Sequence, residues 1–483
     1  MQFNSYLFIL AYLPVLVIGY FLFNKIHVTA GKVYLTAGSA LFYLYGGMDS
    51  FLVFAASILV NYVLATLIPK AGGRKKAVLG LGVFANVALL FWFKYFNFFL
   101  TSINGIFRTD FALENLLLPL GISFFTFQQI MYLVNIYREE LTYTGLLDYL
   151  AYILYFPKLL MGPLAEPGDL MEQLHDPERK KVSWENISYG LKIFSFGLFK
   201  KLVLADTFAL AVSWGFSNVD AATSLDFFLV MLSYTFEIYF DFSGYSDMSV
   251  GVSTMLNIDL PMNFDSPYKA VSIRDFWKRW HMSLTGFFTR YLYIPLGGSR
   301  KGKLRTYGNT MIVFLVSGIW HGANWTFVLW GVLHGLLSVF DRIFEKAEKR
   351  ILKVLRWCAA FFAVNLLWLL FRAESIVQWK NLLVKMFSFQ SMTVSEGLSN
   401  AFVLPETPLI LKVLHLEAWN EAVPGGISLP IFLTAAFLIC LIPKNNYRKL
   451  RSNNLVTLAL AVIALVWGVL VLSSESVFVY LNF

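Results

Sequence analysis

Two histidines in apolar surroundings are the side chains best suited to chemistry in this sequence. The stretch SGIWHGANWTFVLWGVLHG places His321 and Asn324 between Trp320 and Trp325, inside a run whose composition otherwise indicates a membrane helix. An ionisable residue in such a run is costly and marks a functional site by default. A neutral imidazole accepts a proton from a hydroxyl, so His321 is a candidate general base. The alternative is a core histidine bonded to a neighbouring carbonyl.

The stretch SIRDFWKRWHMSLTGFF carries a second polar cluster. At helical spacing Arg274, Lys278 and His281 share one face, and Asp275 and Arg279 form a pair four residues apart beside it. Four charged side chains at the centre of a spanning helix would cost on the order of 10 kcal/mol to insert. The segment therefore lies at the membrane interface as an amphipathic helix, or it lines a cavity.

A third cluster lies in YTFEIYFDFSGYSDMSVG. Glu237 and Asp241 share a face of an apolar helix, and we expect Ser243 and Tyr245 to fall where that helix is interrupted. Carboxylates at membrane depth pair with buried cations, so this cluster is either a charge network that holds helices together or part of a substrate path. The candidate cations are Arg274, Lys278 and Arg279.

The elements that must position these residues are membrane helices. Hydrophobic types make up 58% of the 483 residues and charged types 14%, against about 25% in soluble proteins. The composition predicts an all-α polytopic membrane protein with roughly ten to twelve crossings of about 20 residues. Residues 5–23 indicate a retained membrane helix rather than a signal peptide. The net charge of +9 is explained by basic loops that fix topology, so we expect no nucleic acid partner.

The basic loops predict the orientation of the chain. Short loops rich in lysine and arginine face the cytoplasm, which places both termini outside the cell membrane, together with an insert at 373–427. Residues 309–340 lie between two such loops, so we expect a helical hairpin that breaks near Gly318 and Gly322, with a single tilted span as the alternative. Neither cysteine belongs to a disulfide framework, and we expect no metal site.

Several long motifs resemble one family of membrane enzymes. FDFSGYSDM, NFDSPYKAVSIRDFWKRWHMSLTGFFTRYLYIPLGGSRKGK and SGIWHGANWTFVLWGVLHG are similar to the membrane-bound O-acyltransferase (MBOAT) family, and most of all to its bacterial alginate O-acetyltransferase branch. LPLGISFFTFQQIMYLVNIYR and YFPKLLMGPLAEPGDLMEQL fit as well. The resemblance is strong over about residues 80–345. It implies a single membrane domain over 1–483, with a ring of tilted helices and re-entrant or interfacial helices around a thinned central tunnel.

The resemblance also assigns roles to residues. His321 matches the invariant histidine of the family, and His281 matches its second histidine. After a last membrane helix, within 455–483, the end FVYLNF resembles an aromatic C-terminal motif whose tyrosine is thought to carry the acyl group. The matching residue is Tyr480, which would lie outside the cell. The alternative for this end is a frayed hydrophobic terminus.

The implied reaction moves an acetyl group from a cytoplasmic thioester, acetyl-CoA, to an extracytoplasmic polysaccharide in the bacterial plasma membrane. His321 would act as base and His281 would stabilise the oxyanion. Asn324 would hold the imidazole or the acyl carbonyl, while Trp320 and Trp325 would exclude water from the tunnel. The resemblance implies an SGNH-type acetyltransferase partner and no bound cofactor. The remaining residues expected along the substrate path are Asp241, Ser243, Tyr245 and Arg279.

Three other functions fit the same clusters. A D-alanyl or other acyl group could replace acetyl for a cell-wall polymer. A transporter or flippase of lipid-linked sugars would also need deep polar groups. A structural subunit of an export complex would need no reacting histidine. Of these, only the acyl transferases predict that His321 is required for acyl transfer.

Overall fold

The fold is given by a computed structural model that describes residues 1–142, 144–348, 350–444, 447–451, 454–472 and 478. Within these ranges every regular element is a helix, which confirms the all-α prediction. Clustering of the chain gives two compact units. The first unit comprises residues 1–197, 245–261 and 450–483, and the second comprises 198–244 and 262–449.

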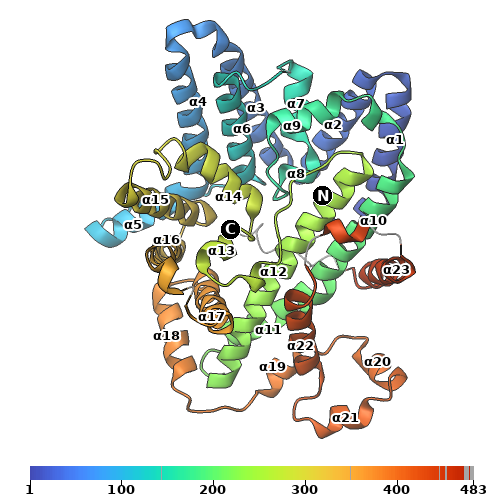
Figure 1. The fold of residues 1–483 in the computed structure, drawn as a ribbon, viewed down its shortest axis with the longest axis vertical. Coiled ribbons are helices and arrows are strands. Elements are labelled where there is room, and N and C mark those ends of the chain that lie inside the picture. Colours follow the sequence, from blue (N-terminus) through green and yellow to red (C-terminus); the bar gives the residue numbers. More distant parts are fainter. Residues whose placement is uncertain (143, 349, 445–446, 452–453, 473–477, 479–483) are drawn as a thin grey trace. The chain divides into compact units, whose positions relative to one another are not determined.

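The first unit is built around neighbouring helices of its N-terminal half. Figure 1 shows α1 beside α2, in blue, and α4 beside α6, and both pairs of helices are in contact. Its α-helices are α1 Leu13–Ile26, α2 Val28–Leu44, α3 Met48–Leu67, α4 Lys75–Leu90, α5 Phe96–Phe107, α6 Ile122–Tyr137, α7 Leu146–Leu154, α8 Phe156–Leu159, α9 Pro167–His175, most of α10 Trp184–Phe199, and α23 Leu455–Leu470. Its short 3-10 and π segments are η1 Phe8–Tyr12, η2 Pro69–Arg74, η3 Phe91–Tyr95 and η4 Glu178–Lys180.

The second unit holds both candidate histidines. Its α-helices are α11 Asp206–Ser217, the first part of α12 Ser224–Met255, α13 Ile273–Trp277, α14 Met282–Phe288, α15 Lys303–His321, α16 Trp325–Glu348, α17 Lys353–Arg372, α18 Ile376–Phe387, α19 Glu396–Asn400, α20 Thr407–Val413, α21 Glu417–Ala422 and α22 Ser428–Leu441. Its short segments are η5 Lys200–Ala205, η6 Pro267–Lys269 and η7 Thr289–Tyr293, and η8 Tyr447–Arg451 follows α22.

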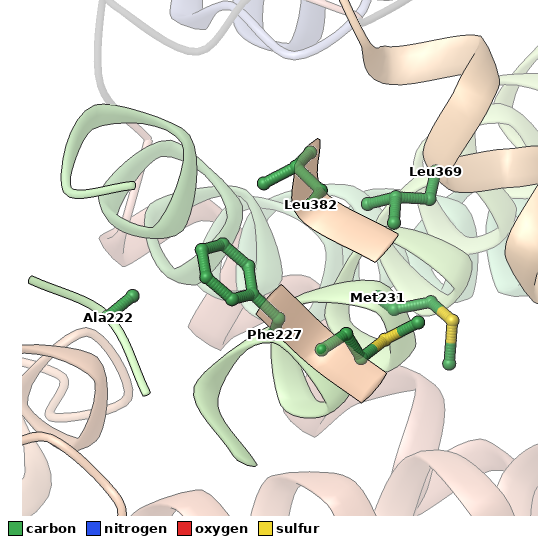
Figure 2. Packing of buried hydrophobic residues seen from close by; sticks show 6 residues of the cluster. Ala222, Phe227, Met231, Leu369 and Leu382 are labelled. Atoms are coloured by element: carbon green, nitrogen blue, oxygen red, sulfur yellow. The ribbon is translucent and has the colours of Figure 1, made fainter. Parts of the chain in front are cut away.

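An apolar cluster joins α12, α17 and α18 within the second unit. Figure 2 shows Phe227 and Met231 facing Leu382 and Leu369, and Ala222 lies beside them. All five side chains are buried. This packing fixes α12, which carries the candidate carboxylates Glu237 and Asp241, against α17, the helix that follows α16.

Long apolar helices confirm a multi-pass membrane protein. Among the described residues, five helical stretches are long and apolar enough to span a bilayer, and α22 and α23 are shorter apolar helices. The five stretches are Phe8–Ile26, Met48–Leu67, Pro69–Phe107, Trp325–Ala347 and Lys353–Arg372. The first of them overlaps the segment 5–23 predicted to be a membrane helix.

Two local predictions about helix boundaries are wrong. α12 continues through Ser243 and Tyr245 to Met255 without the expected interruption. Both side chains are buried, and tight packing overrides the weak helix propensity of serine and glycine. The stretch 272–288 is not one helix, because α13 ends at Trp277 and His281 has a left-handed backbone with φ 46° before α14 begins.

Candidate active site

The sequence around His321 folds as the predicted helical hairpin. α15 ends at His321 because Gly322 has an extended backbone, with φ −163° and ψ 154°. α16 begins three residues later, where Asn324 Oδ1 accepts a hydrogen bond from the Thr326 backbone N–H at 3.0 Å. The helix is therefore broken at Gly322, as predicted. The second predicted break is wrong, because Gly318 lies inside α15.

Gly318 instead permits the close approach of the two arms. A Cβ atom on Gly318 would lie 2.4 Å from the Phe327 carbonyl oxygen and 3.0 Å from the Gly331 Cα. A Cβ atom on Gly331 would meet the Phe314 carbonyl oxygen at the same 2.4 Å. Neither contact tolerates a side chain, so the glycine pair holds α15 directly against α16 and fixes the position of His321.

His321 lies in an aromatic box at the end of α15. Its side chain is buried, and its ring centroid lies 5.0 Å from that of Trp320 and 5.2 Å from those of Trp330 and Phe371. A helix C-terminus carries partial negative charge, which stabilises an imidazolium that forms there. The position therefore suits a ring that accepts a proton during a reaction while apolar neighbours exclude water.

His281 approaches the same tryptophan from the turn between α13 and α14. Its ring centroid lies 6.5 Å from that of Trp320 and 4.6 Å from that of Phe242. The turn lies outside the candidate membrane spans. Burial of the ring lowers the pKa of His281 to about 3, so the imidazole is neutral at pH 7. A neutral imidazole still donates one hydrogen bond, as an oxyanion donor must.

A cavity of about 220 Å³ lies within the second unit, between the α13–α14 segment and the α15–α16 hairpin. His281 and Ser317 line it in the direction of His321, which follows Ser317 by one helical turn. The opposite part is cationic and is lined by Arg274, Lys278 and Arg342. The three residues predicted to share a helical face, Arg274, Lys278 and His281, thus line one cavity although the helix between them is broken.

The three residues predicted to surround His321 lie in different environments. Trp320 is buried and contacts both histidines. Trp325 is 52% exposed, on the first turn of α16. Asn324 Nδ2 donates to the Glu374 carbonyl oxygen at 2.8 Å, so its amide caps α16 and ties it to the segment after α17.

The predicted partners of the buried carboxylates are wrong. Asp241 Oδ1 lies 2.8 Å from Lys201 Nζ, which also lies 2.8 Å from Asp206 Oδ1. Arg279 pairs with Asp275 at 2.8 Å, which confirms that predicted pair, and Arg274 pairs with a glutamate on α16. The sequence carried no signal for Lys201, because it follows a helix of ordinary amphipathic pattern and meets Asp241 only in three dimensions.

Glu237 and Ser243 lie on the same helix as Asp241. Glu237 is buried, and its Oε2 atom has no hydrogen-bond partner among the residues that the structure describes. Ser243 is buried at 1% exposure. Neither residue lines the cavity beside His281.

Tyr245 contacts the C-terminal tail within the first unit. Its ring stacks on Phe3 with centroids 4.9 Å apart, and the ring of Phe478 meets it edge-on at 5.0 Å. Phe478 is buried. Tyr480, the predicted acyl carrier, lies outside the described residues.

The described residues contain no cluster of three or more histidine, cysteine or acidic side chains that could hold a metal ion. Functional candidates missed from the sequence are Ser338 and Arg342, which line the cavity, and His334, which packs on Trp330 with centroids 4.6 Å apart. The available signal was their spacing, because Trp330, His334, Ser338 and Arg342 recur at intervals of four along α16.

Two buried histidines, one of them lining a cavity with a cationic part, are compatible with a membrane acyltransferase. The model of the membrane-bound O-acyltransferase family matches residues 41–377. The chain therefore belongs to the MBOAT family, as its motifs predicted, and it is an O-acyltransferase.

Two relatives of known name cover most of the chain, and a third covers about half of it. A peptidoglycan O-acetyltransferase of Helicobacter pylori is 37% identical over 100% of this chain and 97% of its own length. A probable alginate O-acetylase AlgI of Pseudomonas aeruginosa is 37% identical over 86% of this chain and 81% of its own. A teichoic acid D-alanyltransferase of Bacillus subtilis is 30% identical over 49% of this chain and 62% of its own.

Proposed function

We propose that this O-acyltransferase moves an acetyl group from a cytoplasmic thioester, acetyl-CoA, across the bacterial inner membrane to a polysaccharide outside the cell. The observation that carries the proposal is the buried His321 at the end of α15, separated by Trp320 from the His281 that lines the cavity. The names of two relatives, acting on peptidoglycan and on alginate, support an acetyl group and a polysaccharide acceptor.

In the proposed reaction a hydroxyl attacks the thioester carbonyl. His321 accepts the hydroxyl proton as the new C–O bond forms, and His281 donates a hydrogen bond to the developing oxyanion. Collapse of that intermediate breaks the C–S bond, and the thiolate leaves with the proton returned by His321. The aromatic walls of the His321 site exclude water, which protects the thioester from hydrolysis.

The acceptor hydroxyl inside the protein is proposed to be that of Tyr480. Phe478, two residues earlier, is buried against Tyr245, which supports a tail held inside the molecule rather than frayed from it. An SGNH-type partner outside the cell would then pass the acetyl group to the polymer. This assignment requires both termini and the 373–427 insert to face outward, on a single domain of ten to twelve crossings around a central tunnel.

The test is mass spectrometry of the C-terminal peptide after purified protein is incubated with isotope-labelled acetyl-CoA. Wild type should carry label on Tyr480, whereas Tyr480→Phe and His321→Ala should carry none. Thioester consumption through His321 without label on the tail would contradict the role of Tyr480 as acyl carrier and leave the acyltransferase mechanism at His321 unchanged. Neither label nor consumption in folded protein would contradict the acetyl-CoA donor.

A D-alanyl donor is the second candidate, because the Bacillus subtilis relative is named for that transfer. The match covers only half of this chain, and the acetyl relatives cover most of it. Label from D-alanyl carrier protein, without label from acetyl-CoA, would favour this candidate.

A further inference from the structure

A second cavity, of about 410 Å³, lies between α13, α16 and α17 within the second unit. No described residue lines both this cavity and the one beside His281. Its walls are mostly apolar, with Leu337 and Phe340 on α16 and Ala359 and Ala363 on α17. An apolar cavity of about 150 Å³ already takes up a benzene ring. This one therefore has room for a stretch of hydrocarbon chain.

The cavity opens on the side of the molecule that faces lipid. α16 and α17 both belong to the stretches long and apolar enough to span a bilayer. Ile351 and Leu355 line the cavity and are 49% and 57% exposed, and Leu352 and Val354 beside them are also exposed. Large apolar side chains at the start of a spanning helix are covered by lipid rather than by water. The natural occupant of the cavity is thus a lipid chain.

Arg356 is the cation in the wall of this cavity. Its Nε atom is buried and has no hydrogen-bond partner among the residues that the structure describes. A buried donor without a partner costs about 1–3 kcal/mol, and more when it is charged. Arg356 lies in the first turn of the stretch Lys353–Arg372, at the membrane edge, where headgroup phosphates lie. The next residue is Trp357, a type enriched at that level.

The other polar groups of the lining are already satisfied. Asp341 Oδ2 accepts a hydrogen bond from the Arg274 backbone N–H at 3.0 Å, and Ser272 Oγ accepts one from the Asp275 backbone N–H at 3.2 Å. Arg356 is therefore left to bind an outside anion. A guanidinium matches a phosphate group with paired hydrogen bonds. A headgroup with net negative charge fits better than a zwitterionic one, whose ammonium would offset the attraction.

We propose that this cavity binds one anionic phospholipid, with an acyl chain between α16 and α17 and the lipid phosphate on Arg356. The apolar walls, the opening among lipid-facing side chains and the buried guanidinium atom together specify both ends of the ligand. The inference requires only that the chain lies in a membrane, so it stands apart from the donor and the acceptor of the proposed reaction.

The experiment is native mass spectrometry of the purified full chain in detergent, titrated with phosphatidylglycerol and with phosphatidylcholine of the same acyl chains. Arg356→Gln removes the headgroup contact, and Ala363→Phe fills the chain site. The matched controls are Lys303→Gln, an exposed cation in the first turn of α15, and Cys358→Phe, at an exposed position of α17. Neither control residue lines the cavity.

We expect wild type to bind phosphatidylglycerol about tenfold more tightly than phosphatidylcholine, the effect of one charge-assisted contact. Arg356→Gln should abolish this preference, and Arg356→Lys should retain part of it. Ala363→Phe should weaken both lipids and leave their ratio unchanged. Both controls should behave as wild type, and excess inorganic phosphate should not displace the lipid.

An unchanged lipid preference in Arg356→Gln would overturn the inference. Equal weakening by Cys358→Phe and Ala363→Phe would show a general lipid coat instead of a site. Displacement by inorganic phosphate would identify a free anion as the ligand.

Thermal unfolding midpoints in the same detergent separate lipid binding from a purely structural role of Arg356. Phosphatidylglycerol should raise the midpoint of wild type more than that of Arg356→Gln. Equal losses of midpoint in Arg356→Gln and Asp341→Asn, with no rise from lipid in wild type, would make Arg356 a partner of Asp341 and overturn the site.

Discussion

Two polar clusters buried in the second unit differ in how they are satisfied. Around Lys201, both carboxylates lie 2.8 Å from the ammonium, so each charged group has a partner of opposite sign within the protein. Along α16, Trp330, His334 and Ser338 keep polar atoms that meet no partner in the described residues. Both patterns look alike in sequence, as polar residues in apolar runs. The first cluster therefore ties helices to one another, while the second leaves polar atoms unsatisfied within the described part of the chain.

The largest expected effect is on the rate of acyl transfer at His321. His321→Ala removes the proposed base, so the rate of acetyl transfer should fall by about 10²–10⁴-fold. Labelled acetyl-CoA consumption measures it, with Leu336→Ala as the control. A rate within threefold of wild type would remove His321 from the mechanism.

Breaking the Lys201 cluster should instead lower stability. Lys201→Met leaves Asp241 with an unpaired charge, and removal of one partner of a buried pair costs about 3–5 kcal/mol. The unfolding midpoint in detergent should fall sharply. The double variant Lys201→Met with Asp241→Leu should recover much of the loss, because it removes the fully buried charge and leaves only the partly exposed Asp206. Loss of activity without loss of stability would place this cluster in the reaction.

Variants of His281, compared with those of His321, test the different roles proposed for the two histidines. His281→Ala removes a proposed oxyanion donor, and such losses reduce kcat by about 10²–10³-fold. His281→Gln keeps a donor and should recover part of that loss, whereas His321→Gln should recover none. Equal behaviour of both glutamine variants in the kcat assay would contradict the assignment.

Placing a side chain in the glycine contact between α15 and α16 should have a smaller effect, on stability and kcat. Gly318→Ala places a methyl group 2.4 Å from a carbonyl oxygen, so we expect a loss of about 1–3 kcal/mol of stability with a lower kcat. Gly308→Ala is the matched control, since no atom lies within 4 Å of its Cβ position on the same helix. An unchanged midpoint for Gly318→Ala would show that the hairpin can open at this point.

Breaking the contact between Phe478 and Tyr245 should reduce only the transfer of label to Tyr480. Phe478→Ala removes the ring packed on Tyr245, so label on Tyr480 should fall several-fold while thioester consumption by other acceptors persists. Phe478→Leu should retain part of the label. Peptide mass spectrometry gives both numbers, and full labelling of Phe478→Ala would mean that the tail is held elsewhere.

Much of the fold and part of the site follow from sequence. Apolar length predicted the membrane helices, and the two flanking basic loops together with Gly322 predicted the hairpin that presents His321. The motifs also predicted the family. What failed were contacts between distant segments, such as Lys201 with Asp241, because periodicity describes one helix at a time. The left-handed backbone at His281 was also missed, because a single histidine in a helical pattern gives only a weak local signal for positive φ.

The glycine contact also limits how this hairpin can change length. Because Gly318 and Gly331 face each other without side chains between them, a residue inserted into α16 between Trp325 and Gly331 would rotate Gly331 away by about 100° and bring a side chain into the contact. Insertions and deletions should therefore be excluded from 325–331, and in related sequences Gly331 should keep a constant spacing from the start of α16.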